Sequence, residues 1–440
     1  MTHLGNHVNM VSLGTQAAVE QDSREGEGMT VGIRHDDLRR QNRAMVVSAV
    51  RRAEGVSRTE IASMTGLSHS TISAISSDLI DEGILLPIKG AEATALKRGR
   101  PQVALGLNPD AAYVLTIVLA LNTLTLNLVN YAGGTIGERH VRLPTATMGR
   151  RELTDVVVVA IEDLLSAQAP PTMPVRASMA VQGIIDAHGR ELLWSPITPH
   201  THVPFANVLE ERFGFPVTIE NDCNMIAIAL RERSPERYRD NLTAIMLSNG
   251  IGMGLILGGR LFNGSVSSGG EFGHMTHEPD GALCRCGRHG CIEAYAGNYA
   301  IVRNARSQCR WAQPDADIDE RAMVALAAEA RERQGPEREA FQIAGRAIGY
   351  GLGSLFALID PTPVAIVGPG TAAFDIIEPA LREALARTAG GQDAGSLRFE
   401  LELDERPLIR AGCAHSALAH VDENVFANPA TAMPRQAGAA

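Results

Sequence analysis

The sequence predicts an α/β protein in which a winged helix-turn-helix precedes a larger body of two lobes. Apolar residues recur at helical spacing between residues 36 and 83, and a glycine turn separates two of the helices. From about Ala111 onward, apolar strands alternate with long helices, which is typical of α/β folds. These roughly 330 residues exceed one compact core, so two lobes with a cleft between them are expected.

The chain is long enough for several domains, with 440 residues of which 45% are hydrophobic. Its start is rich in Gly, Glu, Gln, Ser and Thr without apolar periodicity, which is typical of disorder. We expect a disordered leader over residues 1–35, a winged helix-turn-helix domain over 36–108, the body over 109–425 and a flexible tail over 426–440.

Cysteine usage and charge restrict the compartment and the partners. Three of the six cysteines crowd into one loop and the others are scattered, which is no disulfide framework and indicates a reducing compartment. The sequence has no secretion signal and no apolar run near eighteen residues, so we expect a cytoplasmic protein without a membrane segment. The net charge of -10 argues against a protein coated throughout by nucleic acid, although a small basic module fits within it.

Three helices are predicted in the N-terminal domain. The first contains LRRQNRAMVVSAV and stops at Gly55. The second begins at SRTE, where Ser57 caps the helix and Glu60 returns the bond in a capping box. The third runs from Ser68 to Glu82, after the tight glycine turn TGLS, so that the plan is that of a helix-turn-helix. Its predicted buried residues are Ile72, Ile75, Leu79 and Ile80.

The third helix of such a motif enters the major groove of DNA, and its N-terminal residues reach base edges. Small polar side chains at the start of the helix suit this close approach. The predicted contacts are Ser68, His69, Ser70, Thr71 and Ser73.

A basic wing is expected after the third helix. The segments ILLPIKG and KRGRP predict a short strand pair with a basic tip, whose Lys97, Arg98 and Arg100 would lie along or inside a minor groove. Ten Lys and Arg stand against eight Asp and Glu between Asp36 and Pro109, inside an acidic protein. This balance favours DNA, and a helical packing or dimerisation module is the alternative.

The body shows the strands of an α/β fold. A hairpin is predicted in YVLTIVLALNTLTLNLVNYAGG, and single strands in VRASMAVQGIID and PVAIVGPG. Two further strands lie in LTAIMLSNGIGMGLILGGRLFNG. Long helices separate these strands, and no internal repeat is apparent in the sequence.

One loop of the body has the spacing of a metal site. His274, Cys284, Cys286 and Cys291 form a Cys3His set, and thiolates with an imidazole suit tetrahedral zinc. We expect one structural zinc ion per chain, for which a single histidine suffices, so that His277 and His289 in the same loop are not needed. The alternative is a set of buried thiols beside unrelated histidines.

Three motifs together resemble the ROK family of sugar kinases and sugar-responsive repressors. They are GEFGH at Gly270–His274, CRCGRHGCIE at Cys284–Glu293 and IENDCN at Ile219–Asn224, and the resemblance covers roughly residues 37–425. It implies a two-lobed body of the actin and hexokinase type, which is ribonuclease H-like, and the repressor branch carries an N-terminal winged helix. The family's zinc ligands match the four residues of the Cys3His set. Regulators of that branch respond to glucose, xylose, N-acetylglucosamine or related signals.

The resemblance also implies a sugar site. The family's sugar contacts match Asn221, Asp222, Glu271, His274 and Glu293. Carboxylates accept hydrogen bonds from vicinal hydroxyls, so the set suits a sugar. Two positions depart from the family pattern: Ile197 stands where an asparagine is common, and Gln182 replaces the usual proline before Gly183. The ligand is therefore expected to differ from glucose.

Kinase activity depends on phosphate loops as well as on a base. Asp222 matches the general base of the family's kinases. However, Val118–Asn122 replaces the first phosphate loop Asp-Leu-Gly-Gly-Thr, Ser248 and Asn249 replace a glycine and a threonine in the second, and Pro369 in the third has no amide hydrogen.

These losses favour a transcriptional regulator, a repressor, with a sugar-binding body that is not an enzyme and in which Asp222 is a vestigial base. Its expected partners are operator DNA, a sugar or sugar-phosphate effector and further copies of itself in a homodimer or homotetramer. The alternatives are an active ROK-type sugar kinase fused to a DNA-binding domain, and a zinc-stabilised scaffold without a small ligand.

Overall fold

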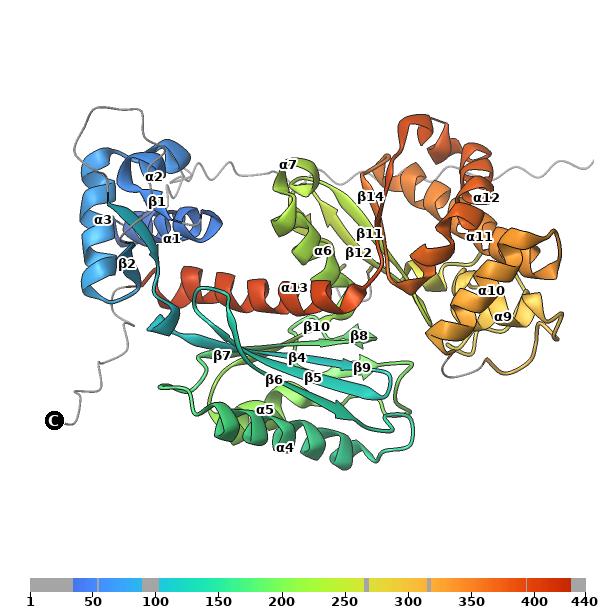
Figure 1. The fold of residues 1–440 in the computed structure, drawn as a ribbon, viewed down its shortest axis with the longest axis horizontal. Coiled ribbons are helices and arrows are strands. Elements are labelled where there is room, and N and C mark those ends of the chain that lie inside the picture. The colour runs from blue at the N-terminus through green and yellow to red at the C-terminus, as the bar shows by residue number, and fades with distance from the viewer. Residues whose placement is uncertain are drawn as a thin grey trace, which may run out of the picture.

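The computed structural model describes residues 35–53, 55–88, 103–264, 269–314, 318–392 and 394–428. Its elements form an N-terminal domain and two lobes, with the helix α13 running between them (Figure 1). Within the described ranges, no helix is both long enough and apolar enough to cross a membrane.

The N-terminal domain has three helices and a small antiparallel sheet of strand order β1-β3-β2. Ser57 caps α2 through the predicted capping box, because its hydroxyl accepts from the Glu60 N–H at 3.3 Å and its own N–H donates to the Glu60 carboxylate at 2.8 Å. Gly66 ends α2 with φ 72°, the left-handed conformation that a tight turn needs. The elements are α1 (His35–Arg52), β1 (Val56–Ser57), α2 (Arg58–Thr65), α3 (His69–Asp81), β2 (Leu85–Ile88) and β3 (Ala104–Leu107).

The strand pair predicted for the wing is present as β2 and β3, which pair antiparallel. The second strand begins at Ala104, after the KRGRP segment. The predicted tip with Lys97, Arg98 and Arg100 lies outside the described residues. The described part therefore fixes the two strands, and the basic tip stays a prediction.

The first lobe is built on a five-stranded sheet of order β10-β7-β4-β5-β6. Its first three strands in the chain form an antiparallel meander, and β7 and β10 then join parallel to β4. Helices α4 and α5 cover one face over an apolar core. The elements are β4 (Tyr113–Ala120), β5 (Thr123–Asn130), β6 (Thr135–Arg142), α4 (Arg150–Gln168), β7 (Arg176–Val181), β8 (Ile184–Ile185), β9 (Leu192–Trp194), α5 (Phe205–Phe213) and β10 (Val217–Asn221), with a 3-10 turn η1 (Pro109–Ala111) before them.

The second lobe repeats this strand pattern in a sheet of order β13-β12-β11-β14-β15. Again three strands form an antiparallel meander, and two more join parallel to the first of them. The structure therefore contains a repeat that the sequence does not show, because the two sheets share their topology and not their residues. Its strands are β11 (Leu242–Leu247), β12 (Ile251–Leu257), β13 (Arg260–Leu261), β14 (Val364–Val367) and β15 (Phe399–Glu402).

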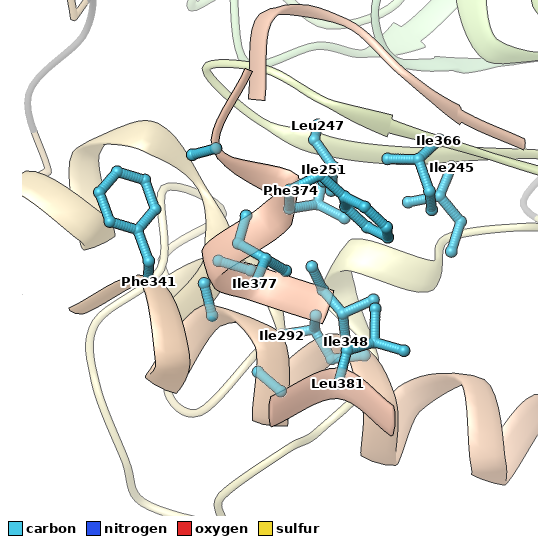
Figure 2. Packing of buried hydrophobic residues seen from close by; sticks show 14 of the residues in the cluster. Ile245, Leu247, Ile251, Ile292, Phe341, Ile348, Ile366, Phe374, Ile377 and Leu381 are labelled. Atoms are coloured by element: carbon cyan, nitrogen blue, oxygen red, sulfur yellow. The ribbon is translucent and has the colours of Figure 1, made fainter. Parts of the chain in front are cut away.

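The helices of the second lobe surround its sheet and pack through a large apolar core. Phe341 and Ile348 of α11 belong to this core together with Ile377 and Leu381 of α12 and Ile245 of β11 (Figure 2). The helices are α6 (Asp222–Arg233), α7 (Pro235–Tyr238), α8 (Glu293–Ala296), α9 (Asn298–Ala305), α10 (Glu320–Glu332), α11 (Pro336–Ile359), α12 (Phe374–Ala386) and α13 (Glu405–His420), with short turns η2 (Phe272–His274), η3 (Pro369–Ala373), η4 (Ala389–Gly391) and η5 (Ala394–Ser396).

Helix α13 connects the lobes with the N-terminal domain. It packs on β4 and β7 of the first lobe and on α6, and Figure 1 shows it reaching from the second lobe toward α1. Gly412 makes the close crossing with α6 possible, since a Cβ at this position would lie 2.1 Å from the Met225 carbonyl oxygen. The π-helical turn η6 (Val421–Val425) continues α13 and contacts α1.

A buried ion pair joins α1 of the N-terminal domain to the turn η6 that follows α13. The Arg51 guanidinium of α1 donates to both carboxylate oxygens of Asp422, at 2.7 and 2.8 Å, and to the Tyr131 carbonyl oxygen at 2.8 Å. The Tyr131 hydroxyl donates to the same carboxylate at 2.7 Å, and Tyr131 is fully buried. Burial and the neighbouring Asp422 charge hold the pKa of Tyr131 well above its usual value, so the phenol stays a donor.

The predicted start of the flexible tail at residue 426 is wrong. Phe426 is 6% exposed, meets the Tyr131 ring edge-on at 4.9 Å and accepts a hydrogen bond from the Arg43 side chain at its carbonyl oxygen. It belongs to the same apolar core as Val46 and Val50 of α1. The burial of Phe426 could not be predicted from the sequence, because Tyr131 and Arg43 lie more than 290 residues before it.

Candidate functional site

A pocket opens where the first lobe meets the second. The ends of β7 and β10 supply one side, and β12, η2 and α8 supply the other. All five residues of the predicted sugar site line it, namely Asn221, Asp222, Glu271, His274 and Glu293. Residues from three sequence motifs are thus brought together in one cavity, although their contact with a sugar stays a prediction.

One side of the pocket is formed by the end of β10 and the N-terminus of α6, which follows it directly. Asn221 caps this helix, and its side-chain oxygen accepts from the N–H groups of Cys223 at 2.8 Å and Asn224 at 3.4 Å. Its amide nitrogen donates to the Gly183 carbonyl oxygen at 2.9 Å. Asn221 therefore holds the two pocket segments together and keeps one amide hydrogen for a ligand.

Asp222 begins α6 and is 8% exposed at the floor of the pocket. Burial raises the pKa of its carboxyl, and the N–H of Cys223, which donates to the carboxylate at 2.9 Å, opposes this rise. The helix N-terminus also favours a negative charge at this position.

Glu271 and His274 reach the pocket from the second lobe through the turn η2. The His274 Nε2 lies 3.8 Å from the Glu271 carboxylate, and the imidazole meets the Trp194 ring edge-on with centroids 5.9 Å apart. Burial raises the pKa of Glu271, although the neighbouring imidazole opposes the rise.

Glu293 links the pocket to the cysteine loop. One of its carboxylate oxygens accepts from the Ile251 N–H at 3.2 Å, and the other lies 3.4 Å from the Tyr299 hydroxyl and 3.6 Å from the Cys284 Sγ. Glu293 is 6% exposed, so these contacts fix its carboxylate at the pocket wall.

The four predicted metal ligands form one cluster. The donor atoms of His274, Cys284, Cys286 and Cys291 all lie within 4.8 Å of one another. The Sγ atoms of Cys286 and Cys291 are 3.7 Å apart, as are the Cys284 Sγ and the His274 Nδ1. Tetrahedral zinc with Zn–S bonds of about 2.3 Å would set its sulfur ligands about 3.8 Å apart. The donors present therefore fit a metal ion, and three thiolates with one imidazole are the chemistry that zinc prefers.

The loop that carries these cysteines is wound tightly by glycine. Gly290 has φ 78°, and a Cβ there would lie 1.7 Å from the Glu278 carbonyl oxygen. His277 and His289, which were judged unnecessary, lie outside the cluster and pack their rings against Tyr295 and Trp311.

The predicted DNA contacts lie at the start of α3. Ser68 caps the helix by accepting from the Thr71 N–H at 3.1 Å, and its hydroxyl also lies 2.8 Å from the hydroxyls of both Ser70 and Thr71. His69 and Ser73 are exposed, whereas Thr71 is half-buried. As predicted, Ile72, Ile75 and Leu79 are buried on the opposite face, and Ile80 is partly buried.

The three segments that were aligned with kinase phosphate loops lie at a strand end and in turns, and their correspondence to those loops stays a prediction. Val118–Asn122 ends β4 and turns into β5, with Asn122 at φ 58°. The Asn249 side chain accepts from the Ile318 N–H at 3.2 Å, and Pro369 opens the turn η3.

Sequence reasoning missed three pocket residues as ligand contacts: Gln182, Trp194 and Asn224. Gln182 and Trp194 come from β7 and the small β8-β9 hairpin, and Asn224 from the first turn of α6. The sequence singles out Gln182 only as a departure from the family pattern, and it does not single out Trp194. An aromatic ring beside polar residues was the available signal, since sugars are commonly bounded by such a ring.

Two sheets of the same topology with a pocket between them define an actin/hexokinase-like body. The model of the ROK family matches residues 122–402, more than half of the chain. The chain belongs to the ROK family.

Several curated relatives carry the names of regulators. A putative xylose repressor of Caldicellulosiruptor sp. is 26% identical over 389 residues, which cover 86% of this chain and 96% of that protein. The transcriptional dual regulator NagC of Escherichia coli is 24% identical over 383 residues, which cover 86% and 92%.

Solved structures share the fold. A ROK family transcriptional regulator, a homologue of the E. coli MLC protein, has a TM-score of 0.73 at 21% identity and covers 89% of this chain and 99% of its own. A ROK glucokinase from Streptomyces griseus with glucose and AMPPNP has a TM-score of 0.53 at 23% identity and covers 70% and 98%. The regulator therefore covers a larger share of this chain than the kinase does, and the difference is about the size of the N-terminal domain.

Proposed function

We propose that this protein is a DNA-binding transcriptional repressor whose ROK body binds a sugar as effector. The proposal rests on the connection between two parts. One is a helix-turn-helix with a polar, exposed recognition face, and the other is a body with a carboxylate-lined pocket. The ion pair between Arg51 and Asp422 joins them. Repressors of xylose and N-acetylglucosamine metabolism among the relatives support this assignment.

The DNA-binding part acts through α3, with Ser68, His69, Ser70, Thr71 and Ser73 toward base edges and Lys97, Arg98 and Arg100 of the wing on the minor groove. A homodimer or homotetramer would match an operator with two related half-sites, because operator symmetry mirrors protein symmetry. Zinc held by His274, Cys284, Cys286 and Cys291, at one ion per chain, stabilises the loop that positions Glu293.

The body is proposed to bind its sugar without phosphorylating it. Asp222 retains the position of a base, but Pro369 has no N–H for a nucleotide, and the Asn249 side chain is engaged by Ile318. Phosphoryl transfer depends on a cradle of amides and cations around the phosphates, and a base alone does not replace it. The second candidate is a sugar kinase fused to a DNA-binding domain, which the kinase fold of the body and the buried Asp222 favour.

Two measurements separate these functions. Selection of bound fragments from random DNA, followed by fluorescence anisotropy at several salt concentrations, should recover a two-fold symmetric site, and added sugar should change its affinity. Coupled-enzyme detection of ADP with the same sugars and magnesium should find no turnover above that of Asp222→Ala. ADP formation that Asp222→Ala abolishes would show that the protein is a sugar kinase. If no DNA site is selected, the proposed repressor function is wrong.

A further inference from the structure

Three buried oxygen atoms lie unpaired on one face of the first-lobe sheet. They are the Oγ1 of Thr116, the Oγ of Ser178 and the Oδ1 of Asn127, and none of them has a hydrogen-bond partner among the residues that the structure describes. The three residues are 1%, 1% and 4% exposed. A buried polar group without a partner lowers stability, so native proteins almost always pair such groups with protein atoms or with water.

The three residues form a row across adjacent strands. Thr116 of β4 is paired with Asn127 of β5 on one side and with Ser178 of β7 on the other. Neighbouring strands lie about 4.8 Å apart, so successive side chains of the row are separated by about this distance. A water molecule that makes two hydrogen bonds of about 2.8 Å bridges oxygens about 4.5–5.6 Å apart. The row therefore has the spacing that bridging water requires.

The row faces helix α13. Along β4, Val114 belongs to the apolar core that contains Ala417 of α13, and Val118 belongs to the core that contains Cys413. Thr116 lies between these two valines and on the same face of the strand, since alternate residues share a face. The row thus separates two apolar contacts between α13 and the sheet, and Figure 1 shows α13 lying over these strands.

The side chains of α13 at this level do not replace the missing partners. Cys413 and Ala417 are fully buried, and neither carries an oxygen or a nitrogen in its side chain. Burial raises the pKa of the Cys413 thiol to about 12, so this group stays neutral. The long side chain of Arg410 instead donates to the Glu138 carboxylate of β6. Because the three side chains of the row are also uncharged, the matching ligand is neutral and both donates and accepts hydrogen bonds.

Both ends of the row meet polar residues that have partners. Ser178 is paired across β7 and β10 with Thr218, whose hydroxyl accepts from the Arg176 guanidinium. Asn127 is paired across β5 and β6 with Glu138, whose side chain is 38% exposed. The row therefore approaches solvent at its β6 end, which provides a route by which water exchanges.

From this row we propose that the contact between α13 and the first-lobe sheet binds water molecules, which bridge Asn127, Thr116 and Ser178. Buried water typically makes about three hydrogen bonds to polar groups that are otherwise unpaired, as these oxygens are. Helix α13, which connects the lobes with the N-terminal domain, is thus held on the first lobe by two apolar contacts with a hydrated strip between them. The inference is independent of the function proposed above.

The sign of a stability change tests this inference on the full-length protein. Thr116→Val replaces the hydroxyl by a methyl group of similar size. If water bridges the hydroxyl, the variant loses hydrogen bonds and melts at a lower temperature, whereas removal of a hydroxyl without any partner raises the melting temperature. We expect Thr116→Val and Ser178→Ala each to lower the melting temperature by at least about 2 °C. Thr123→Val, at an exposed position of β5, is the control and should change it little.

A crystal structure of the unaltered protein, at a resolution that shows ordered buried water, gives the direct observation. It should show water within about 2.7–3.2 Å of at least two of the three oxygens, and this water should be absent or displaced in Thr116→Val. An unchanged or higher melting temperature in both variants overturns the inference. Direct hydrogen bonds among the three side chains without water also overturn it, as does a peak with several oxygen contacts of about 2.3–2.6 Å, which would identify a bound cation.

Discussion

Cys284 is the member of the Cys3His cluster that also contacts a pocket residue, because its Sγ is close to both the His274 Nδ1 and the Glu293 carboxylate. We expect Cys284→Ala to lose the bound metal and to lower the melting temperature, since structural zinc contributes folding free energy directly. Cys309→Ala is the control, because this thiol is exposed and outside the cluster. Elemental analysis and thermal melting check the prediction, which fails if Cys284→Ala retains one zinc ion per chain.

Glu293 is the pocket carboxylate whose role is most easily isolated. In Glu293→Gln the amide oxygen still accepts from the Ile251 N–H, so fold and metal should be preserved. Loss of a charged acceptor should weaken sugar binding by about ten- to a hundredfold, as hydrogen bonds to charged groups contribute about 1.5–3 kcal/mol. Titration calorimetry measures this with whichever sugar binds the unaltered protein. Unchanged affinity in a folded, metal-loaded Glu293→Gln would remove Glu293 from the sugar site.

Site residues that belong to a short sequence motif could be predicted, whereas residues brought to the site by long-range packing could not. The cysteine spacing predicted the metal cluster within one loop, and the motif around Asn221 predicted that part of the pocket. Trp194 was missed because it reaches the pocket through the β8-β9 hairpin, and Gln182 because it lies just beyond the end of β7. The hydrogen bond from the Asn221 amide to the Gly183 carbonyl oxygen was also not foreseen, because Gly183 is 38 residues away.

At the level of single elements, α3 offers the sharpest test of DNA binding. Ser73→Asp places a negative charge on the exposed face of its first turns, where the phosphates and base edges would repel it. We expect operator affinity to fall by at least about tenfold, while melting temperature is unchanged. Ser166→Asp, on the exposed side of α4 in the body, is the matched control. Equal operator affinity in the two variants would show that α3 does not face DNA.

The elements themselves followed from periodicity and turn chemistry. The capping box at Ser57, the glycine turn at Gly66 and the β4-β5 hairpin are all where the sequence predicted them. The sequence did not predict that the two sheets share one strand order, because strand order depends on contacts between segments far apart in the chain. The course of α13 between the lobes was hidden for the same reason.

For the molecule as a whole, the junction of Arg51 with Asp422 joins the N-terminal domain to the body. Asp422→Ala would leave the guanidinium without its partner in a site where their side chains are 14% and 6% exposed. Removal of one member of a buried pair costs about 3–5 kcal/mol in the free energy of unfolding, so melting temperature and operator affinity should both fall.

Asp155→Ala is the control for this prediction, because its pair with Arg151 is exposed and should be worth less than about 1 kcal/mol. Denaturant unfolding and anisotropy are the measurements. An Asp422→Ala protein as stable as the control would show that the junction does not hold the two parts together.

The burial of Phe426 against α1 has a consequence for synthesis. The wing strand β3 ends at Leu107, and the ribosome must add about 320 further residues before Phe426 can complete the core of the N-terminal domain. At about 5–20 residues per second this takes roughly 16 to 64 s. During that interval the part of this core that Val421 and Phe426 cover in the finished protein is not yet covered. The N-terminal domain therefore reaches its final packing only when synthesis of the chain is nearly complete.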